Sequence, residues 1–325
     1  MALLVLLALA GCGGSESEDT GQAPSGGAFP VTIEHKFGET TIPEAPERVV
    51  AVGFNDQDFA LALGVKPVGV RQFQGGIDIS KRPWAQDELG GASPEIVGAE
   101  ELELEKIAAL RPDVILGVYS GLTEDQYDTL SKIAPTVAQS GEYVDFGEPW
   151  PEQAKVTGQA LGLDDEGAEV VDDVDTRFAR AREANPELEG STFAFASAAT
   201  GKVYVYGPQD LRTRFFTSLG LTTPPELAKL TKESFFAEVS EERLRLLDQD
   251  LLVVYGAPKD LDAFPLFERL RATREGRVIF LDPAGDLANA LGFSSPLSLP
   301  YALDEGLPRI EAALDGDPRT PVKPG

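Results

Sequence analysis

The sequence predicts an α/β protein with two lobes joined by a single long helix and a ligand cleft between the lobes. Three observations carry this prediction. Strand and helix patterns alternate along the chain, one segment recurs in its second half, and one uninterrupted amphipathic helix separates the halves. With 325 residues and 42% apolar content, the chain is long enough to bury two cores of ordinary domain size.

The N-terminus has the layout of a signal peptide. Residues 2–10 form an apolar run that is too short to span a bilayer, and Gly11 and Cys12 follow at once. Residues 9–12, Leu-Ala-Gly-Cys, resemble the bacterial lipobox, so we expect Cys12 to carry a lipid. Gly, Ser and acidic residues then predict a flexible tether. The expected organisation is a signal peptide at 1–12, a tether at 13–28, an N-terminal lobe at 29–163, a spine helix at 164–187, a C-terminal lobe at 188–315 and a tail at 316–325.

The strand pattern includes an internal repeat. Short apolar runs at 48–53, 113–118, 192–196, 250–255 and 277–281 read as strands between helical segments. The helix–strand unit around Glu105 and Asp113 can be laid over the one around Glu242 and Asp250, because both pairs are separated by 137 residues (242 − 105 and 250 − 113). A looser echo relates residues 53–58 to 207–210. We therefore expect two lobes of related plan, with ligand-facing loops after their strands.

A single amphipathic helix lies between the lobes. Apolar residues recur at helical spacing from Ala168 through Val174 and Phe178 to Ala181, and Pro186 stops the pattern. The predicted helix at 165–184 spans about 30 Å at 1.5 Å per residue. A lone helix of this length suits a rigid spine that limits hinge closure. The alternative is a helix packed inside one lobe.

Charge and metal-ligand content exclude several functions. The chain has 28 Lys and Arg against 54 Asp and Glu, a formal charge of −26, which repels nucleic acid. One cysteine excludes an internal disulfide, and one histidine, His35, leaves no cluster for a zinc or copper site built by the protein. We expect His35 to lie at the surface, and any metal to arrive already chelated or to be held by oxygens.

Several motifs in order resemble a known family. Beside the lipobox and the spine, they are the segments 46–51, 63–70, 104–113 and 298–303. Together they resemble the helical-backbone binding proteins of ferric-siderophore, haem and cobalamin importers, and residues 118–136 resemble the iron-siderophore branch. The resemblance implies a monomeric, lipid-anchored protein outside the cell membrane. It would capture an Fe(III)-siderophore, without a cofactor of its own, and deliver it to an ABC permease. Haem or cobalamin cargo stays open.

The resemblance also assigns a docking pair. Family members use one glutamate on each lobe to contact arginines of the permease, and the motifs carry these positions over to Glu105 and Glu242. The repeat selects the same pair independently, since equivalent positions on two similar lobes can meet a two-fold symmetric partner. The alternative is that each carboxylate only favours the N-terminus of its helix.

A ferric chelate is already six-coordinate, so its receptor needs aromatic side chains and charge-assisted donors instead of metal ligands. The candidates follow predicted strands: Asn55, Arg71, Trp84 and Tyr119 on the first lobe, and Tyr206, Arg212, Arg214, Phe293 and Ser294 on the second. Packing for the aromatic residues and surface ion pairs for the arginines are the alternatives. Some hydroxamate-binding members carry an arginine shortly before the Leu-Glu motif, and residues 97–101 have none. This departure weakens a specific claim for hydroxamates, and the chelate class stays open.

An enzyme is the rival from another class. The sequence contains no Gly-x-Ser-x-Gly elbow, no phosphate-binding Gly-x-x-x-x-Gly-Lys-Ser/Thr loop and no Gly-x-Gly-x-x-Gly, and a single histidine leaves few nucleophile–base pairs. A surface lipoprotein enzyme is therefore the less favoured alternative.

Overall fold

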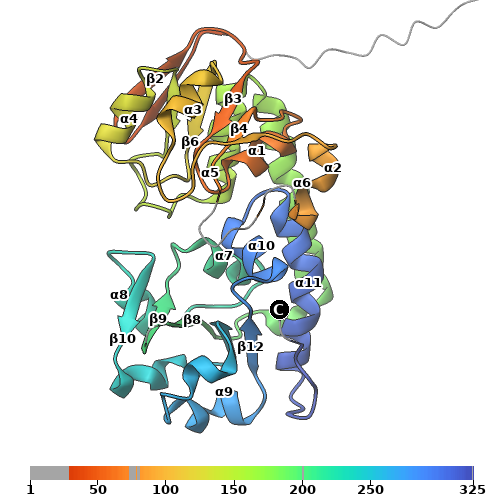
Figure 1. Cartoon of the computed structure of the whole chain (residues 1–325). Coiled ribbons are helices and arrows are strands. Elements are labelled where there is room, and N and C mark those ends of the chain that lie inside the picture. The colour runs from red at the N-terminus through yellow and green to blue at the C-terminus, as the bar shows by residue number, and fades with distance from the viewer. Residues whose placement is uncertain (1–28, 73–77, 79–80, 200, 324) are drawn as a thin grey trace, which may run out of the picture.

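The computed structural model describes residues 29–72, 78, 81–199, 201–323 and 325; Cys12 and the expected tether lie outside them. The chain forms two α/β lobes, one above the other in Figure 1, with helices α6 and α11 along one side of the molecule. Each lobe is built on a five-stranded sheet. The predicted fold class is confirmed.

The N-terminal sheet is parallel, with the order β5-β4-β3-β6-β7. Its strands are β3 (Val49–Ala51), β4 (Gly69–Val70), β5 (Glu95–Ile96), β6 (Val114–Gly117) and β7 (Thr136–Ala138). The connecting helices are α1 (Asp56–Ala62), η2 (Pro83–Ala85), α2 (Gln86–Leu89), α3 (Leu104–Ala109) and α4 (Glu124–Leu130). β3 and β6 are buried throughout, as expected for strands covered on both faces.

A hairpin that sequence reasoning missed precedes this sheet. Strands β1 (Val31–His35) and β2 (Gly38–Ile42) pair antiparallel. His35 ends β1 and is only 7% exposed, so the expected surface position was wrong. Its ring packs 4.9 Å from that of Tyr127, its Nε2 lies 2.9 Å from Thr40 Oγ1, and burial lowers its pKa.

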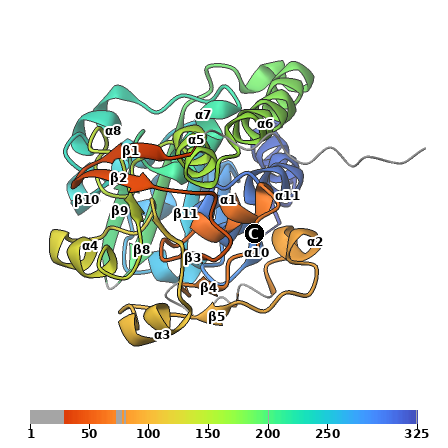
Figure 2. The same cartoon turned by 90° about the horizontal axis from the view of Figure 1, so that it is seen from above.

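Helix α5 (Trp150–Leu161) ends the first lobe, and α6 (Asp164–Ala184) follows it. The position of α6 agrees with the amphipathic pattern, and it buries Val174, Phe178 and Ala181. It packs against α5 of the first lobe and α11 (Ser298–Leu314) of the second. In both views it lies on the same side of the molecule as α11 (Figures 1 and 2), so it connects the lobes instead of belonging to one of them.

The C-terminal sheet is mixed, with the order β10-β9-β8-β11-β12. β8, β11 and β12 are parallel, whereas β9 and β10 are antiparallel additions. The strands are β8 (Phe193–Ala199), β9 (Lys202–Tyr206), β10 (Phe236–Val239), β11 (Leu251–Tyr255) and β12 (Val278–Leu281). The helices are η3 (Pro186–Leu188), α7 (Leu211–Ser218), α8 (Pro225–Leu230), η4 (Glu241–Leu247), η5 (Pro258–Leu261), η6 (Phe267–Arg269), α9 (Arg271–Arg274) and α10 (Asp286–Phe293), followed by α11.

The repeated aspartates hold equivalent places in the two sheets. Asp113 precedes β6, and its Oδ2 accepts the backbone N–H groups of Glu47 and Arg48, both at 2.8 Å, just before the paired strand β3. Asp250 precedes β11, and its Oδ2 accepts the N–H and Oγ1–H of Thr192, at 2.9 and 2.7 Å, just before the paired strand β8. The looser echo is only local, because α1 follows the parallel strand β3 whereas α7 follows the antiparallel strand β9.

Candidate functional site

A cavity of about 210 Å³ lies between the lobes. Both lobes contribute side chains to it, and most of these are aromatic. The lining residues are Phe54, Tyr119 and Phe146 from the first lobe, and Arg212, Phe235, Tyr255, Ala288, Asn289, Gly292 and Phe293 from the second. Sequence reasoning named Tyr119, Arg212 and Phe293 among these.

Strand ends supply several of these side chains. Phe54 follows β3, Tyr119 follows β6, and Tyr255 is the last residue of β11. Since parallel strands end at the same edge of a sheet, neighbouring strands deliver their following residues to one place. The strand ends that the sequence argument pointed to therefore lie at the cavity in both lobes.

An aromatic wall, which we define as Phe54, Tyr119, Phe146 and Phe235, runs across the lobe boundary. Phe146 lies at its centre: its ring centroid is 5.2 Å from Tyr119, 6.1 Å from Phe54 and 6.3 Å from Phe235 of the other lobe. The backbone of Phe146 is left-handed, with a φ of 62°. A Cβ at Gly121 would lie 2.5 Å from the Phe146 ring, so glycine is needed there to leave room for the wall.

Arg212 brings a fixed positive charge to the cavity. Its Nε and Nη2 donate to Asp210 at 2.9 and 2.7 Å, and the guanidinium carbon lies 3.9 Å from the ring centre of Tyr206. Burial disfavours the charged form of Arg212, but Asp210 more than offsets this, and the pKa of Arg212 is raised. The Tyr206 ring thus packs against the guanidinium of Arg212, although Tyr206 is not among the residues that line the cavity.

Arg71 packs against Phe54 of the aromatic wall and is not among the residues that line the cavity. Its Nε and Nη2 donate to the carbonyl oxygens of Ala99 and Glu100, both at 2.7 Å, and its guanidinium carbon is 4.3 Å from the ring centre of Phe54. We expected the N–H groups of Arg71 to meet a ligand, but two of them hold the backbone of Ala99 and Glu100. The guanidinium also packs on the Phe54 ring and so helps to position it. Residues 97–101 contain no arginine of their own, and Arg71, which follows β4, contacts their backbone.

Arg214 follows Arg212 by two residues, on the same helix α7. Its Nη1 is buried and has no hydrogen-bond partner among the described residues. Burial lowers its pKa, and Asp210, Tyr143 and Tyr119 counter this. Arg214 is therefore a half-buried cation beside the aromatic wall with donor capacity unused.

Three predicted site residues are not among those that line the cavity: Asn55 and Trp84 make contacts between the lobes, and Ser294 ends a helix. Asn55 donates from Nδ2 to the carbonyl of Phe293 at 2.8 Å, across the lobe boundary. Ser294 ends α10 with a φ of 44° and donates to the carbonyl of Leu291 at 2.6 Å. Trp84 is 8% exposed, and its ring packs 6.0 Å from that of Phe293.

A buried polar network at this boundary was not foreseen. Asp58 accepts hydrogen bonds from Arg82 Nη1 at 3.1 Å, from Trp84 Nε1 at 2.8 Å and from Ser295 Oγ of the second lobe at 3.0 Å. The side chains of Asp58 and Arg82 are both 0% exposed. We call these four residues the Asp58 network. No single-sequence pattern signals it, because its members are far apart in the chain and Ser295 joins them only when the lobes pack.

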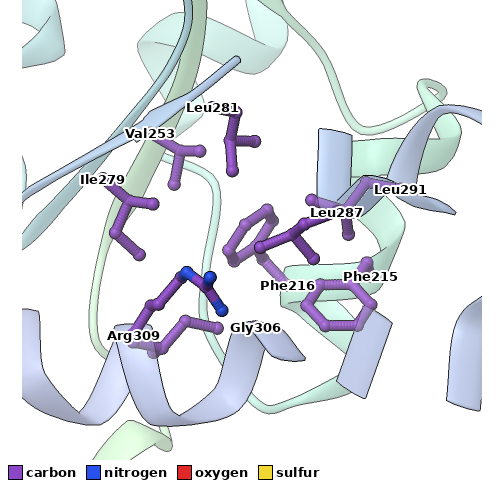
Figure 3. A pocket seen from close by; sticks show the side chains of 10 residues that line it. Phe215, Phe216, Val253, Ile279, Leu281, Leu287, Leu291, Gly306 and Arg309 are labelled. Atoms are coloured by element: carbon purple, nitrogen blue, oxygen red, sulfur yellow. The ribbon is translucent and has the colours of Figure 1, made fainter. Parts of the chain in front are cut away.

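A second pocket lies under the C-terminal sheet, between α7, α10 and α11 (Figure 3). Phe215, Phe216, Leu287 and Leu291 contribute to its apolar lining, and Arg309 lies at its edge. Its volume of about 10 Å³ has room for about one water molecule. We regard it as a small packing gap in the core.

Comparisons with known proteins agree with this architecture. A family model described as periplasmic binding protein matches residues 51–284. The chain belongs to the periplasmic binding protein family. A periplasmic solute binding protein from Mycobacterium smegmatis is 37% identical, with a TM-score of 0.76 over 87% of this chain and 98% of that one. PiaA of Streptococcus pneumoniae, in complex with ferrichrome, is 31% identical, with a TM-score of 0.78 over 88% of this chain and 99% of that one. The probable siderophore-binding lipoprotein YfiY of Bacillus subtilis is 29% identical over 78% of this chain and 76% of its own.

As a periplasmic binding protein, the chain presents its cavity at the lobe boundary, and the predicted docking glutamates lie elsewhere. Glu105 and Glu242 are both exposed. Each lies in the first turn of its helix, α3 or η4, which leads into the strand that starts after Asp113 or Asp250. Among the described residues, no group of three or more His, Cys, Asp or Glu side chains is placed to hold a metal, and no helix has the length and apolar composition to cross a membrane.

Proposed function

We propose that this protein captures a ferric siderophore between its lobes and delivers it to the permease of an ABC importer. The observation that carries the proposal is the cavity in which both lobes supply aromatic side chains around the fixed guanidinium of Arg212. Such a lining suits a bulky chelate with a polar rim. Membership of the periplasmic binding protein family supports it, as do relatives described as binding ferrichrome or a siderophore.

Calorimetric titration of the purified protein with ferrichrome and with its iron-free form tests this proposal. Iron organises the chelate before binding, whereas ordering the free ligand would cost affinity, so we expect the loaded form to bind at least about tenfold more tightly. Equal affinity for the two forms would show that the cavity recognises something other than the ferric complex.

Delivery needs contact with the permease, and we propose that Glu105 and Glu242 make it. Their exposure and their equivalent positions in the two lobes support a role in docking to a partner with two similar halves. We also propose that a lipid on Cys12 holds the protein at the outer face of the cell membrane. Labelling with a tagged fatty acid should mark the wild type, and equal labelling of Cys12→Ala would contradict the anchor.

A further inference from the structure

The cavity holds little net charge. Of its described lining residues, Arg212 is the only one with a charged side chain, and Asp210 accepts two of its hydrogen bonds. A carboxylate in bidentate contact neutralises a guanidinium at close range. A ligand that touches Arg212 therefore meets an ion pair instead of a free cation.

The second charge pair near the cavity is balanced as well. Arg71, behind Phe54, interacts electrostatically with Asp56. The carboxylate of Asp56 accepts the backbone N–H groups of Gly53, Val118 and Tyr119 at 3.0 to 3.1 Å. Burial raises the pKa of Asp56 to about 6, so this carboxylate is mostly ionised at pH 7. Arg71 and Asp56 therefore cancel to a first approximation.

Arg214 is the cation that remains, and Asp210 is the acid that acts on it. Counting Arg71, Arg212 and Arg214 against Asp56 and Asp210 leaves about one positive charge beside the cavity. The chain as a whole carries −26. An approaching anion is therefore repelled at long range and finds little compensation at the site.

Ferric siderophores differ in this respect. Three hydroxamate groups with one negative charge each neutralise Fe(III), whereas three catecholate groups with two negative charges each leave an excess of three, and citrate complexes are also anionic. We infer that the cleft selects electrically neutral ferric chelates of the tris-hydroxamate class over anionic catecholate and citrate complexes. This inference rests on the proposed function and assigns a substrate class to the same cavity.

The test is a calorimetric titration of the purified protein at pH 7 and low salt, with ferrichrome and with a ferric tris-catecholate. We expect ferrichrome to bind at least about tenfold more tightly. Equal or tighter binding of the tris-catecholate would overturn the inference and leave the proposed function standing. Failure of both chelates to bind would instead overturn the proposed function.

A charge variant tests the cause of the selection. Asp210→Asn keeps a side-chain oxygen that can accept the N–H groups at the start of α7, but it frees the charge of Arg212. We expect the ratio of tris-catecholate affinity to ferrichrome affinity to rise about fivefold or more, whatever the variant does to both affinities together. Asp128→Asn is the matched control, because Asp128 is exposed on α4 and its replacement changes the net charge by the same amount. An equal rise in the control would show that overall charge, and not the cavity, makes the selection.

Salt provides a measurement on the unmodified protein, in case Asp210→Asn does not fold. Exclusion of the anion by charge should weaken when ions screen the field. We therefore expect the preference for ferrichrome to shrink at about 0.5 M NaCl. A preference that does not change with salt would contradict a charge-based selection.

Discussion

Ser295 of the C-terminal lobe donates its hydroxyl hydrogen to Asp58 of the N-terminal lobe at 3.0 Å, in a region from which water is excluded. The same carboxylate holds Arg82 and Trp84. The lobes are thus joined by a buried hydrogen bond to a charged carboxylate as well as by the spine helix. They cannot move far apart without exposing the Asp58–Arg82 ion pair that lies beside this bond.

The first prediction concerns the stability contributed by the Asp58 network. Asp58→Asn removes the ionised carboxylate that is hydrogen-bonded to the buried Arg82, so we expect the free energy of unfolding to fall by about 3 to 5 kcal/mol. Ser295→Ala removes one hydrogen-bond donor and should lower it by about 1 to 3 kcal/mol. Urea denaturation measures both. Glu238→Gln, which breaks the exposed pair with Lys202, is the control and should change little. A similar loss in all three variants would contradict a special role for the network.

The second prediction concerns Phe146. Phe146→Ala removes the ring that contacts Tyr119 of the first lobe and Phe235 of the second. We therefore expect affinity for a ferric chelate to fall about tenfold or more. The ring is half-buried, so the fold should survive. Calorimetric titration with ferrichrome measures the affinity, and circular dichroism checks the fold. Phe236→Ala is the matched control, since Phe236 is 40% exposed and is not among the residues that line the cavity. Unchanged affinity in Phe146→Ala would place the ligand elsewhere.

The third prediction concerns pH. Burial raises the pKa of Glu148 to about 7, while its Oε2 accepts the backbone N–H of Ser140 at 2.8 Å. Between pH 4.5, its ordinary pKa, and about 7, the folded state binds more protons than the unfolded state. The free energy of unfolding should therefore fall as pH rises through this window, by at most about 3 kcal/mol from this group.

Glu148→Gln should remove this component and be more stable than the wild type at pH 8, while the two should be similar near pH 4.5. Urea denaturation across the pH range provides the measurement. Part of the slope should persist in the variant, because the pKa of Asp56 is raised to about 6 in the same direction. Glu124→Gln, an exposed change on α4, is the control and should leave the slope intact. An unaltered slope in Glu148→Gln would be incompatible with this assignment.

The fourth prediction separates ligand capture from delivery. A double variant that carries Glu105→Ala and Glu242→Ala should bind ferrichrome with unchanged affinity, since neither residue lines the cavity. Uptake of labelled iron by cells should fall strongly, because removing one member of an interfacial charge pair can cost roughly 2 to 5 kcal/mol. Glu241→Ala is a control with an exposed glutamate beside Glu242. Normal uptake in the double variant would contradict docking and would mean that each glutamate only favours the N-terminus of its helix.

Sequence reasoning succeeded where local patterns determine structure. The apolar runs marked the positions of β3, β6, β8, β11 and β12, and the 137-residue repeat placed Asp113 and Asp250 before equivalent strands. Helical spacing likewise located α6. Each of these features depends on residues close in the chain, or on a pattern that occurs twice.

It failed where a side chain's role depends on packing between distant segments. Trp84 was expected in a loop after a strand, but it lies in η2, where Phe293 and Tyr301 of the second lobe pack against it. Phe146 lies in a loop without a strand or motif to mark it, and a left-handed backbone turns it toward the cavity. His35 looked polar and exposed because nothing in its local sequence reveals the neighbouring Tyr127.

One contiguous apolar cluster contains Phe59 of the first lobe, Phe178 of the spine helix and Phe293 of the second lobe. Each half also has apolar clusters of its own, but this shared cluster makes the interior of each half depend on the other, so the chain is not modular despite its bilobal outline. We expect a single calorimetric melting transition whose van't Hoff and calorimetric enthalpies agree. Two resolved transitions would contradict this. The same dependence means that one half cannot be exchanged with that of a relative unless the side chains facing it are exchanged too.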